Sequence, residues 1–104
     1  MKRAYTFTEM DAMGIDEALY SLMDKEGVFK ANLDFKRWGN KRNIIGYFTL
    51  DDGSKIVSSA WKNCRYLGIP EIPLNSYLEL TYEKAKNGVC YLRKVNMLAK
   101  RGEK

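Results

Sequence analysis

The residues of this 104-residue chain that are best suited to chemistry are a group of basic side chains around one tryptophan. In the run Arg37–Asn43, Trp38 stands between Arg37 and the pair Lys41 and Arg42. Cationic side chains contact phosphates, and a flat aromatic ring can stack on a nucleic-acid base, at about 1–3 kcal/mol per base by alanine substitution. This combination of residue types favours a polyanionic ligand with exposed bases.

No comparable set of residues suits catalysis. The chain has no histidine, no nucleophile motif and no glycine-rich phosphate loop, and its carboxylates are scattered. Asp51 and Asp52 are explained by a turn, so they do not predict a metal site. Cys64 and Cys90 lie far apart among apolar neighbours and are expected to be small core residues. The sequence therefore predicts no enzyme, no cofactor and no metal site.

Length and composition predict a single domain, residues 1–104, with one hydrophobic core. The formal charge of +5, from 18 Lys and Arg against 13 Asp and Glu, is modest, so the positions of the charges matter more than their sum. No apolar run has bilayer-spanning length, and Met1–Tyr5 is not followed by the apolar core of a signal peptide. We expect a cytoplasmic protein with no membrane contact, and its oligomeric state stays open.

Helical spacing of apolar residues appears first near the N-terminus. Acidic residues early in this stretch, Lys25 near its end and Gly27 after it are typical helix signals. The spacing predicts an amphipathic helix of about three turns within an N-terminal helix region, residues 8–27. Thr8 could cap an earlier start, although Gly14 disfavours that turn. The apolar stripe, expected to pack on the strands, consists of Ile15, Ala18, Leu19, Leu22 and Met23.

Alternating apolar and polar residues then predict five strands, followed by a polar tail over residues 99–104. Asp-Gly at 52–53 and Asn-Gly at 87–88 suit two-residue hairpin turns, which need positive φ angles. Two prolines between the third and fourth strands leave room for a short helix at most. The predicted strands are Val28–Trp38, Ile44–Leu50, Lys55–Trp61, Ser76–Lys84 and Val89–Leu98.

The first turn predicts which residues of its hairpin face the core. Centring the hairpin on Asp52-Gly53 pairs Phe48 with Val57 and Tyr47 with Ser58. Phe48 and Val57 then belong to the core side, and Tyr47 belongs to the outer side.

The second turn predicts the pairing of the last two strands. Centring it on Asn87-Gly88 pairs Leu80 with Val95 and Leu78 with Met97. Two apolar faces then coincide, which supports this register independently.

Three meandering strands, a linking segment and a terminal hairpin resemble the order of elements in an OB fold. Over residues 28–98 the chain resembles the small single-stranded-nucleic-acid-binding proteins of bacteria and their phages. The resemblance implies a mainly β protein, here with an N-terminal helix, that forms a five-stranded OB-like antiparallel barrel. An SH3-like barrel is the alternative, but the long first strand and the helix-sized gap before the fourth strand favour the OB fold.

OB domains bind single strands on the face of strands two and three and on the loops that join strands one to two and four to five. In this chain those loops are Arg37–Asn43 and Glu83–Gly88. The resemblance thus implies binding of single-stranded nucleic acid, DNA more than RNA, without strong sequence preference. The expected binding residues are Arg37, Trp38, Lys41, Arg42, Tyr47, Trp61, Lys62, Arg65, Lys84 and Lys86.

Structural roles compete with these assignments. The Trp38 ring could instead fold over the barrel mouth, and the turn register points Trp61 inward, which favours a structural role for it. A second function from another class also stays open: a small protein-interaction adaptor or inhibitor, encoded by a phage or mobile element. Such a module would use the helix stripe or the barrel surface.

Overall fold

The computed structural model describes residues 4–39, 44–58 and 68–99. Within these ranges the chain is mainly β, with one six-stranded sheet and one short helix. In chain order the elements are α1 (Phe7–Ala12), the 3-10 turn η1 (Glu17–Leu19), β1 (Ser21–Leu22), β2 (Gly27–Trp38), β3 (Ile44–Leu50), β4 (Lys55–Val57), the 3-10 turn η3 (Ile69–Glu71), β5 (Tyr77–Lys84) and β6 (Cys90–Ala99). Cys64 and five of the expected binding residues lie outside the described residues: Lys41, Arg42, Trp61, Lys62 and Arg65.

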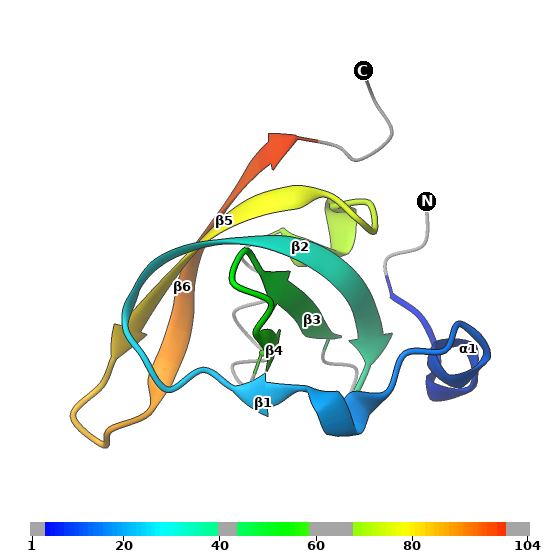
Figure 1. The fold of residues 1–104 in the computed structure, drawn as a ribbon, viewed down its shortest axis with the longest axis horizontal. Helices are drawn as coiled ribbons and strands as arrows, with labels where there is room; N and C mark the ends of the chain where they lie inside the picture. The colour runs from blue at the N-terminus through cyan, green and yellow to red at the C-terminus, as the bar shows by residue number, and fades with distance from the viewer. Residues whose placement is uncertain (1–3, 40–43, 59–67, 100–104) are drawn as a thin grey trace.

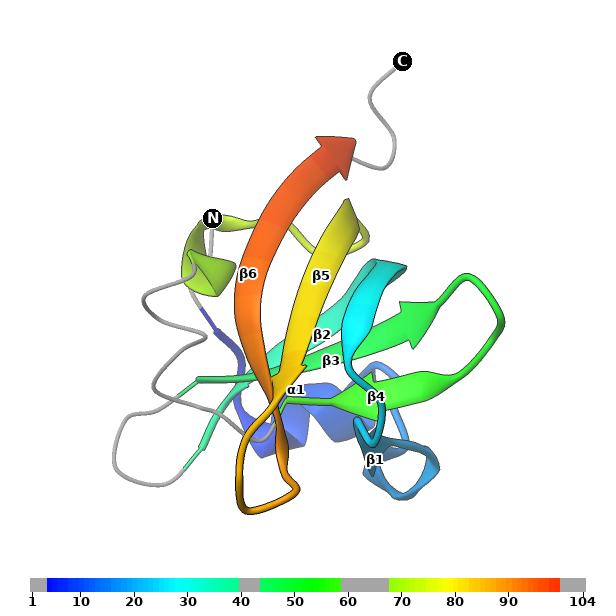
Figure 2. The same cartoon turned by 90° about the vertical axis from the view of Figure 1, so that its left-hand side faces the viewer.

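Strand β2 is central in the sheet, whose strand order is β1-β4-β3-β2-β5-β6. Its first half, Gly27–Asn32, pairs with β5, and its second half, from Ala31 to Trp38, pairs with β3. Neighbouring strands are antiparallel except β1 and β4, which are parallel. Figure 1 shows β2 arching over the molecule, and Figure 2 shows β5 and β6 crossing the direction of β3 and β4. The sheet therefore bends around an interior.

The mainly β class is confirmed, but within the described residues the sheet is not closed into a barrel. Strands β2 to β6 each overlap one of the five predicted strands. Strand β4 covers Lys55–Val57, and residues 59–61 of the third predicted strand lie outside the described residues. Strand β1, which no sequence pattern indicated, adds to the edge of β4. No helix in the described part of the chain has the length and apolar character needed to cross a membrane.

The N-terminal helix is shorter and earlier than expected. Thr6 caps α1: its hydroxyl accepts a hydrogen bond from the Glu9 amide, and the Glu9 carboxylate accepts one from the Thr6 amide. Gly14, at φ +76°, then turns the chain away from the helix axis. The helix predicted over the stripe from Ile15 to Met23 was wrong, because η1 and β1 occupy that stretch.

Pairing with a distant strand overrides the helical spacing of this stretch. Ser21 pairs with Ile56 and Leu22 pairs with Val57, so the edge of β4 supplies the partners of this backbone. Of the predicted stripe, Met23 is buried in the main core, whereas Leu22 is exposed.

A β-bulge at Asp34 decides which residues of β2 face the core. Leu33 pairs with Phe48 and Phe35 pairs with Tyr47, so Asp34 is an extra residue in this strand. After Asp34, each side chain of β2 therefore lies on the opposite face from the one that regular alternation would give it. Leu33 and Phe48 lie in the main cluster inside the curved sheet, and Phe35 and Tyr47 lie in a second cluster on its outer face. The regular alternation predicted one face for Leu33 and Phe35, which is wrong beyond the bulge.

Two hydrophobic clusters result, although the chain length predicted one. The main cluster lies inside the sheet and includes Ala31 and Leu80. The outer cluster is centred on the fully buried side chains of Met10, Phe35 and Tyr47. Residues 5–20, called the N-terminal segment below, cover this outer cluster.

The β3–β4 hairpin differs from its predicted register by one residue. Tyr47 pairs with Val57 and not with Ser58. The loop holds three residues, Asp51–Gly53, and Gly53 has a φ of +91°. The extra loop residue shifts the pairing and turns Val57 to the outer face, so its predicted place on the core side was wrong.

The β5–β6 hairpin keeps its predicted pairing, with Leu80 opposite Val95 and Leu78 opposite Met97. Its loop also holds three residues, Lys86–Gly88, since the amide before the loop donates to the carbonyl after it at 2.9 Å. A bulge partway along the hairpin offsets this shift and restores the predicted register. Leu78 and Leu80 are fully buried, which confirms the core face of β5.

Candidate functional site

Arg37 and Tyr47 lie on the outer face of the sheet and are bound by the N-terminal segment. Arg37 Nε donates to the Tyr47 hydroxyl oxygen at 3.1 Å, and Arg37 Nη2 donates to Glu17 Oε1 at 3.1 Å. The Tyr47 hydroxyl donates to the same carboxylate oxygen at 2.8 Å. The guanidinium carbon also lies 5.2 Å from the centre of the Phe7 ring. Glu17 and Phe7 therefore contact both the charge and the flat face of Arg37.

Tyr47 is fully buried beneath these contacts. The Tyr20 ring meets it edge-on, with ring centres 5.1 Å apart. Burial raises the pKa of the Tyr47 phenol, and the hydrogen bond from Arg37 opposes that rise. Tyr47 is on the outer side as predicted, but its expected role as an exposed stacking surface needs correction, because the N-terminal segment covers it.

Trp38 is 40% exposed, and its backbone is hydrogen-bonded on both sides. Its amide donates to the Tyr5 carbonyl oxygen at 2.8 Å, and it pairs with Ile44 of β3. Strand alternation places its side chain on the opposite side of the sheet from that of Arg37. Arg37, Trp38 and Tyr47 therefore do not form one surface, and Trp38 is the exposed one of the two aromatic residues.

Lys84 and Lys86 are exposed at the other end of β2. Tyr82 pairs with Gly27, so the β5–β6 loop lies beside the beginning of β2, whereas Trp38 lies at its end. Strand β2 is twelve residues long. The strand pairing places the described part of the first basic loop and the second basic loop at opposite ends of β2.

Asp34, which no sequence pattern singled out, is the centre of a polar cluster on the outer face. Its carboxylate accepts hydrogen bonds from the Tyr20 hydroxyl and from Asn32 Nδ2, both at 2.7 Å, and a further one from Thr49. Lys55 Nζ lies 4.0 Å from the same carboxylate. Burial, and then the bond to Asp34, raises the pKa of the Tyr20 phenol. This cluster anchors the end of the N-terminal segment to the sheet.

The sequence signal that could have marked Asp34 is a carboxylate between two large apolar residues, Leu33 and Phe35, in the middle of a strand. An acid in that setting needs partners or a bulge that redirects it. The structure provides both.

Lys36 is fully buried, because the bulge turns its side chain into the interior. Its ammonium group donates to the carbonyl oxygens of Pro70 and Ile72, at 2.9 and 2.7 Å. These bonds tie the η3 turn to β2 next to Trp38. Lys36 therefore acts as a structural cation within the protein.

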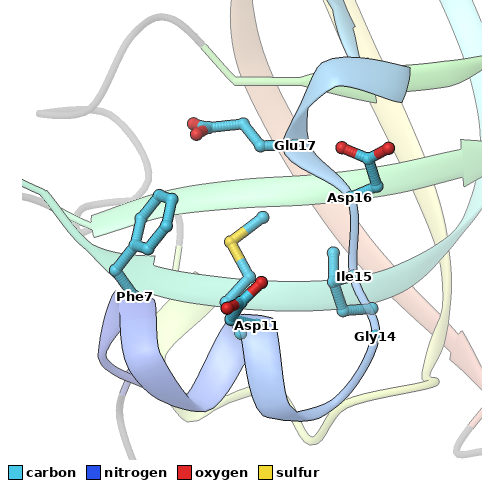
Figure 3. A pocket seen from close by; sticks show the side chains of 7 residues that line it. Phe7, Asp11, Gly14, Ile15, Asp16 and Glu17 are labelled. Carbon is cyan, nitrogen blue, oxygen red and sulfur yellow. The ribbon is translucent and has the colours of Figure 1, made fainter.

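A pocket of about 260 Å³ opens between α1 and η1, and Figure 3 shows its lining side chains on one side of the sheet. Its walls combine the apolar residues Phe7, Met10 and Ile15 with the acidic residues Asp11, Asp16 and Glu17. Residues 4–26 as a whole hold six acidic side chains and one lysine. This surface therefore carries the opposite charge to the predicted basic loops and disfavours a polyanion.

Within the described ranges, no group of three or more His, Cys, Asp or Glu side chains could hold a metal ion. Cys90 is a buried free thiol, as predicted. Compared with protein-family models, curated proteins and solved structures, the chain matches none of them. Fold and site together define a mainly β protein with a curved, open sheet, an acidic cover on one face and an exposed tryptophan at the end of its central strand.

Proposed function

We propose that this chain is an OB-like, non-enzymatic module of the cytoplasm that binds single-stranded nucleic acid, DNA more than RNA, without strong sequence preference. The exposed Trp38 ring carries the proposal, because it lies at the end of β2 and the basic residues Lys41 and Arg42 follow it three and four residues further along the chain. Aromatic rings stack on bases of any type, and cations contact phosphates whatever the sequence. OB barrels are partly open, which is compatible with a sheet that is not closed.

The fixed backbone around Trp38 favours such a contact. Stacking on a side chain whose strand is already ordered loses less conformational entropy than stacking on a free loop. A ligand that contacts both ends of β2 has to span that strand. We therefore expect Lys84 and Lys86 to contribute to binding of long oligonucleotides and not of short ones.

Titration with a labelled oligo-dT of about 20 nucleotides at several salt concentrations tests the proposal. Trp38→Ala should lose about 1–3 kcal/mol of binding free energy with nearly unchanged salt dependence, because stacking releases few ions. Replacing Lys41 and Arg42 by alanine should weaken binding to all sequences alike and reduce the salt slope by about 0.7 per lost phosphate contact.

Lys86→Ala is the control for loss of charge away from Trp38. With an oligonucleotide too short to span β2, it should bind as the wild type does. The proposal fails if the wild-type protein at low salt gives no saturable signal with oligo-dT or with mixed-sequence DNA.

A protein-interaction role, as a small adaptor or inhibitor encoded by a phage or mobile element, is the second candidate. The observation in its favour is a set of large apolar side chains exposed in the N-terminal part of the chain: Phe7, Met13, Leu19 and Leu22. Exposed apolar side chains that form a contiguous patch are typical of surfaces that bind proteins. A folded wild-type protein that binds no oligonucleotide would make this the leading function.

A further inference from the structure

The outer-face groups that suit a nucleotide are already bound by the chain itself. Glu17 presents a carboxylate oxygen to Arg37 at 3.1 Å and to the Tyr47 hydroxyl at 2.8 Å. Phe7 lies against the Arg37 guanidinium, and Tyr20 lies against the Tyr47 ring. Phosphate oxygens accept from the same donors, and bases stack on the same surfaces. The N-terminal segment thus offers this face an anion and two rings, the groups that a nucleotide strand would offer.

The segment is attached at its two ends, where Tyr5 bridges to Arg37 and the Tyr20 hydroxyl donates to Asp34, and its attachment between these ends is limited. Helix α1 has six residues, far fewer than an isolated helix needs to be stable in water. Gly14 joins it to η1, and no atom lies within 4 Å of the position of its missing Cβ. Phe7 and Met13 are each more than half exposed, while Met10 is buried as the main apolar anchor. The part of the segment from Phe7 to Glu17 can therefore detach while its two ends and the pairing of β2 with β3 and β5 remain in place.

The negative charge of the segment also opposes binding of nucleic acid at the outer face. While it is attached, its carboxylates repel a polyanion from the outer face. Once it detaches, Arg37 and the Tyr47 ring become accessible. The acidic residues of this part of the chain are Glu9, Asp11, Asp16, Glu17, Asp24 and Glu26.

We propose that the N-terminal segment is an internal competitor of the nucleic-acid ligand: it occupies the outer face of β2 and β3, and a bound single strand displaces it. This inference rests on the proposed function. If only the detached form binds at this face, the measured Kd equals the intrinsic Kd divided by the fraction of molecules with a detached segment. Any change that weakens the attachment should therefore tighten binding.

Two substitutions that each remove one negative charge distinguish competition for the outer face from a general electrostatic effect on binding. Glu17→Gln removes the carboxylate that contacts Arg37 and Tyr47. Asp11→Asn removes the same charge from the rim of the same pocket. With labelled oligo-dT of about 20 nucleotides, we expect Glu17→Gln to bind at least about fivefold more tightly than the wild type, a typical coupling between two sites. Asp11→Asn should change the Kd much less.

Hydrogen exchange provides the second measurement. The amides of Met10 and Met13 donate to the carbonyls of Thr6 and Glu9 at 3.0 Å, and they should exchange faster in the oligo-dT complex. Equal Kd values of the two variants, with unchanged exchange in the complex, would overturn the competitor and leave the proposed function intact. Absence of binding by both the wild type and Glu17→Gln would overturn both. Binding by Glu17→Gln alone would support the competitor.

Discussion

Gly88 shows how one residue sets the geometry of a hairpin. Its φ of +84° costs an L-residue about 1–2 kcal/mol, and no atom within 4 Å of the position of its missing Cβ would add a clash. We therefore expect Gly88→Val to lower the free energy of unfolding by about 1–2 kcal/mol in urea denaturation, through backbone strain alone. Asn87 has no positive φ, so the expectation that both turn positions need one was wrong for Asn87.

Two neighbours serve as controls for this change. Asn87→Ala removes the side-chain oxygen that accepts from the Val89 amide at 2.9 Å and should have a smaller effect. Lys86→Ala should be close to neutral. An unchanged unfolding midpoint of Gly88→Val would contradict the three-residue loop.

Tyr20 should make the stability of the protein depend on alkaline pH. Burial, together with the bond to Asp34, raises its pKa above the usual 10.0. The folded protein then keeps the phenol neutral where the unfolded chain ionises. The stabilisation is therefore complete below about pH 10 and is lost as the pH rises above that value.

Urea denaturation from about pH 9 to about pH 11 measures this dependence. The wild type should lose unfolding free energy over that interval, and Tyr20→Phe, which has no ionisable group at this position, should lose less. Tyr47, whose pKa is also raised, is present in both proteins. Equal slopes would show that the Tyr20–Asp34 contact does not form in solution.

Among the elements, β2 is decisive because it contributes to both faces of the sheet. Before Asp34 its apolar residues enter the main core, and after Asp34 they enter the outer cluster. The same reversal turns Lys36 inward and leaves Trp38 exposed on the side opposite to Arg37. One extra residue thus decides which face of the sheet each of these side chains occupies.

Gly46 of β3 lies opposite Lys36 and lacks room for a side chain. A Cβ there would lie 2.9 Å from Cζ of the fully buried Phe48 ring. We expect Gly46→Ala to cost about 1–3 kcal/mol of stability, as overpacking of cores does. In a Phe48→Leu background the same change should cost less, because the shorter side chain leaves space. Equal costs in both backgrounds, measured by urea denaturation, would exclude the clash.

For the molecule as a whole, charge is separated along the chain. Residues 4–26 are acidic, and the positive excess of the chain lies mainly after Gly27. The acidic part is also the part that covers the outer cluster with a short helix and a turn. The N-terminal segment therefore differs from the sheet both in the sign of its charge and in the way it is attached to the core.

We expect this difference to appear in hydrogen exchange of the protein without ligand. Local opening should release the α1 amides, such as that of Met10, well before the amides of β2 and β5, which open only when the sheet unfolds. Mass spectrometry of peptides from each region measures the two rates. The same slow exchange in α1 and β5 would mean that the segment unfolds only with the whole domain.

The sequence by itself determined the mainly β class, the strands that overlap β2 to β6, and the core face of Leu78 and Leu80. Alternation of period two and glycine turns are local properties, so they can be recognised without the fold. Sequence also located Trp38 at the end of a strand. It could not show whether that ring is exposed, which depends on what packs over it.

Tertiary structure alone decided the rest. The stretch from Ser21 became strand because β4 offers an edge to it, although its own apolar spacing is helical. The bulge at Asp34 and the three-residue loop before Ser54 changed faces and register, which local patterns do not encode. Tyr47 lost its predicted exposure because a segment about thirty residues earlier in the chain packs on it. The strand at Ser21 and the burial of Tyr47 depend on contacts between residues distant in sequence, whose free energies outweigh the local preferences.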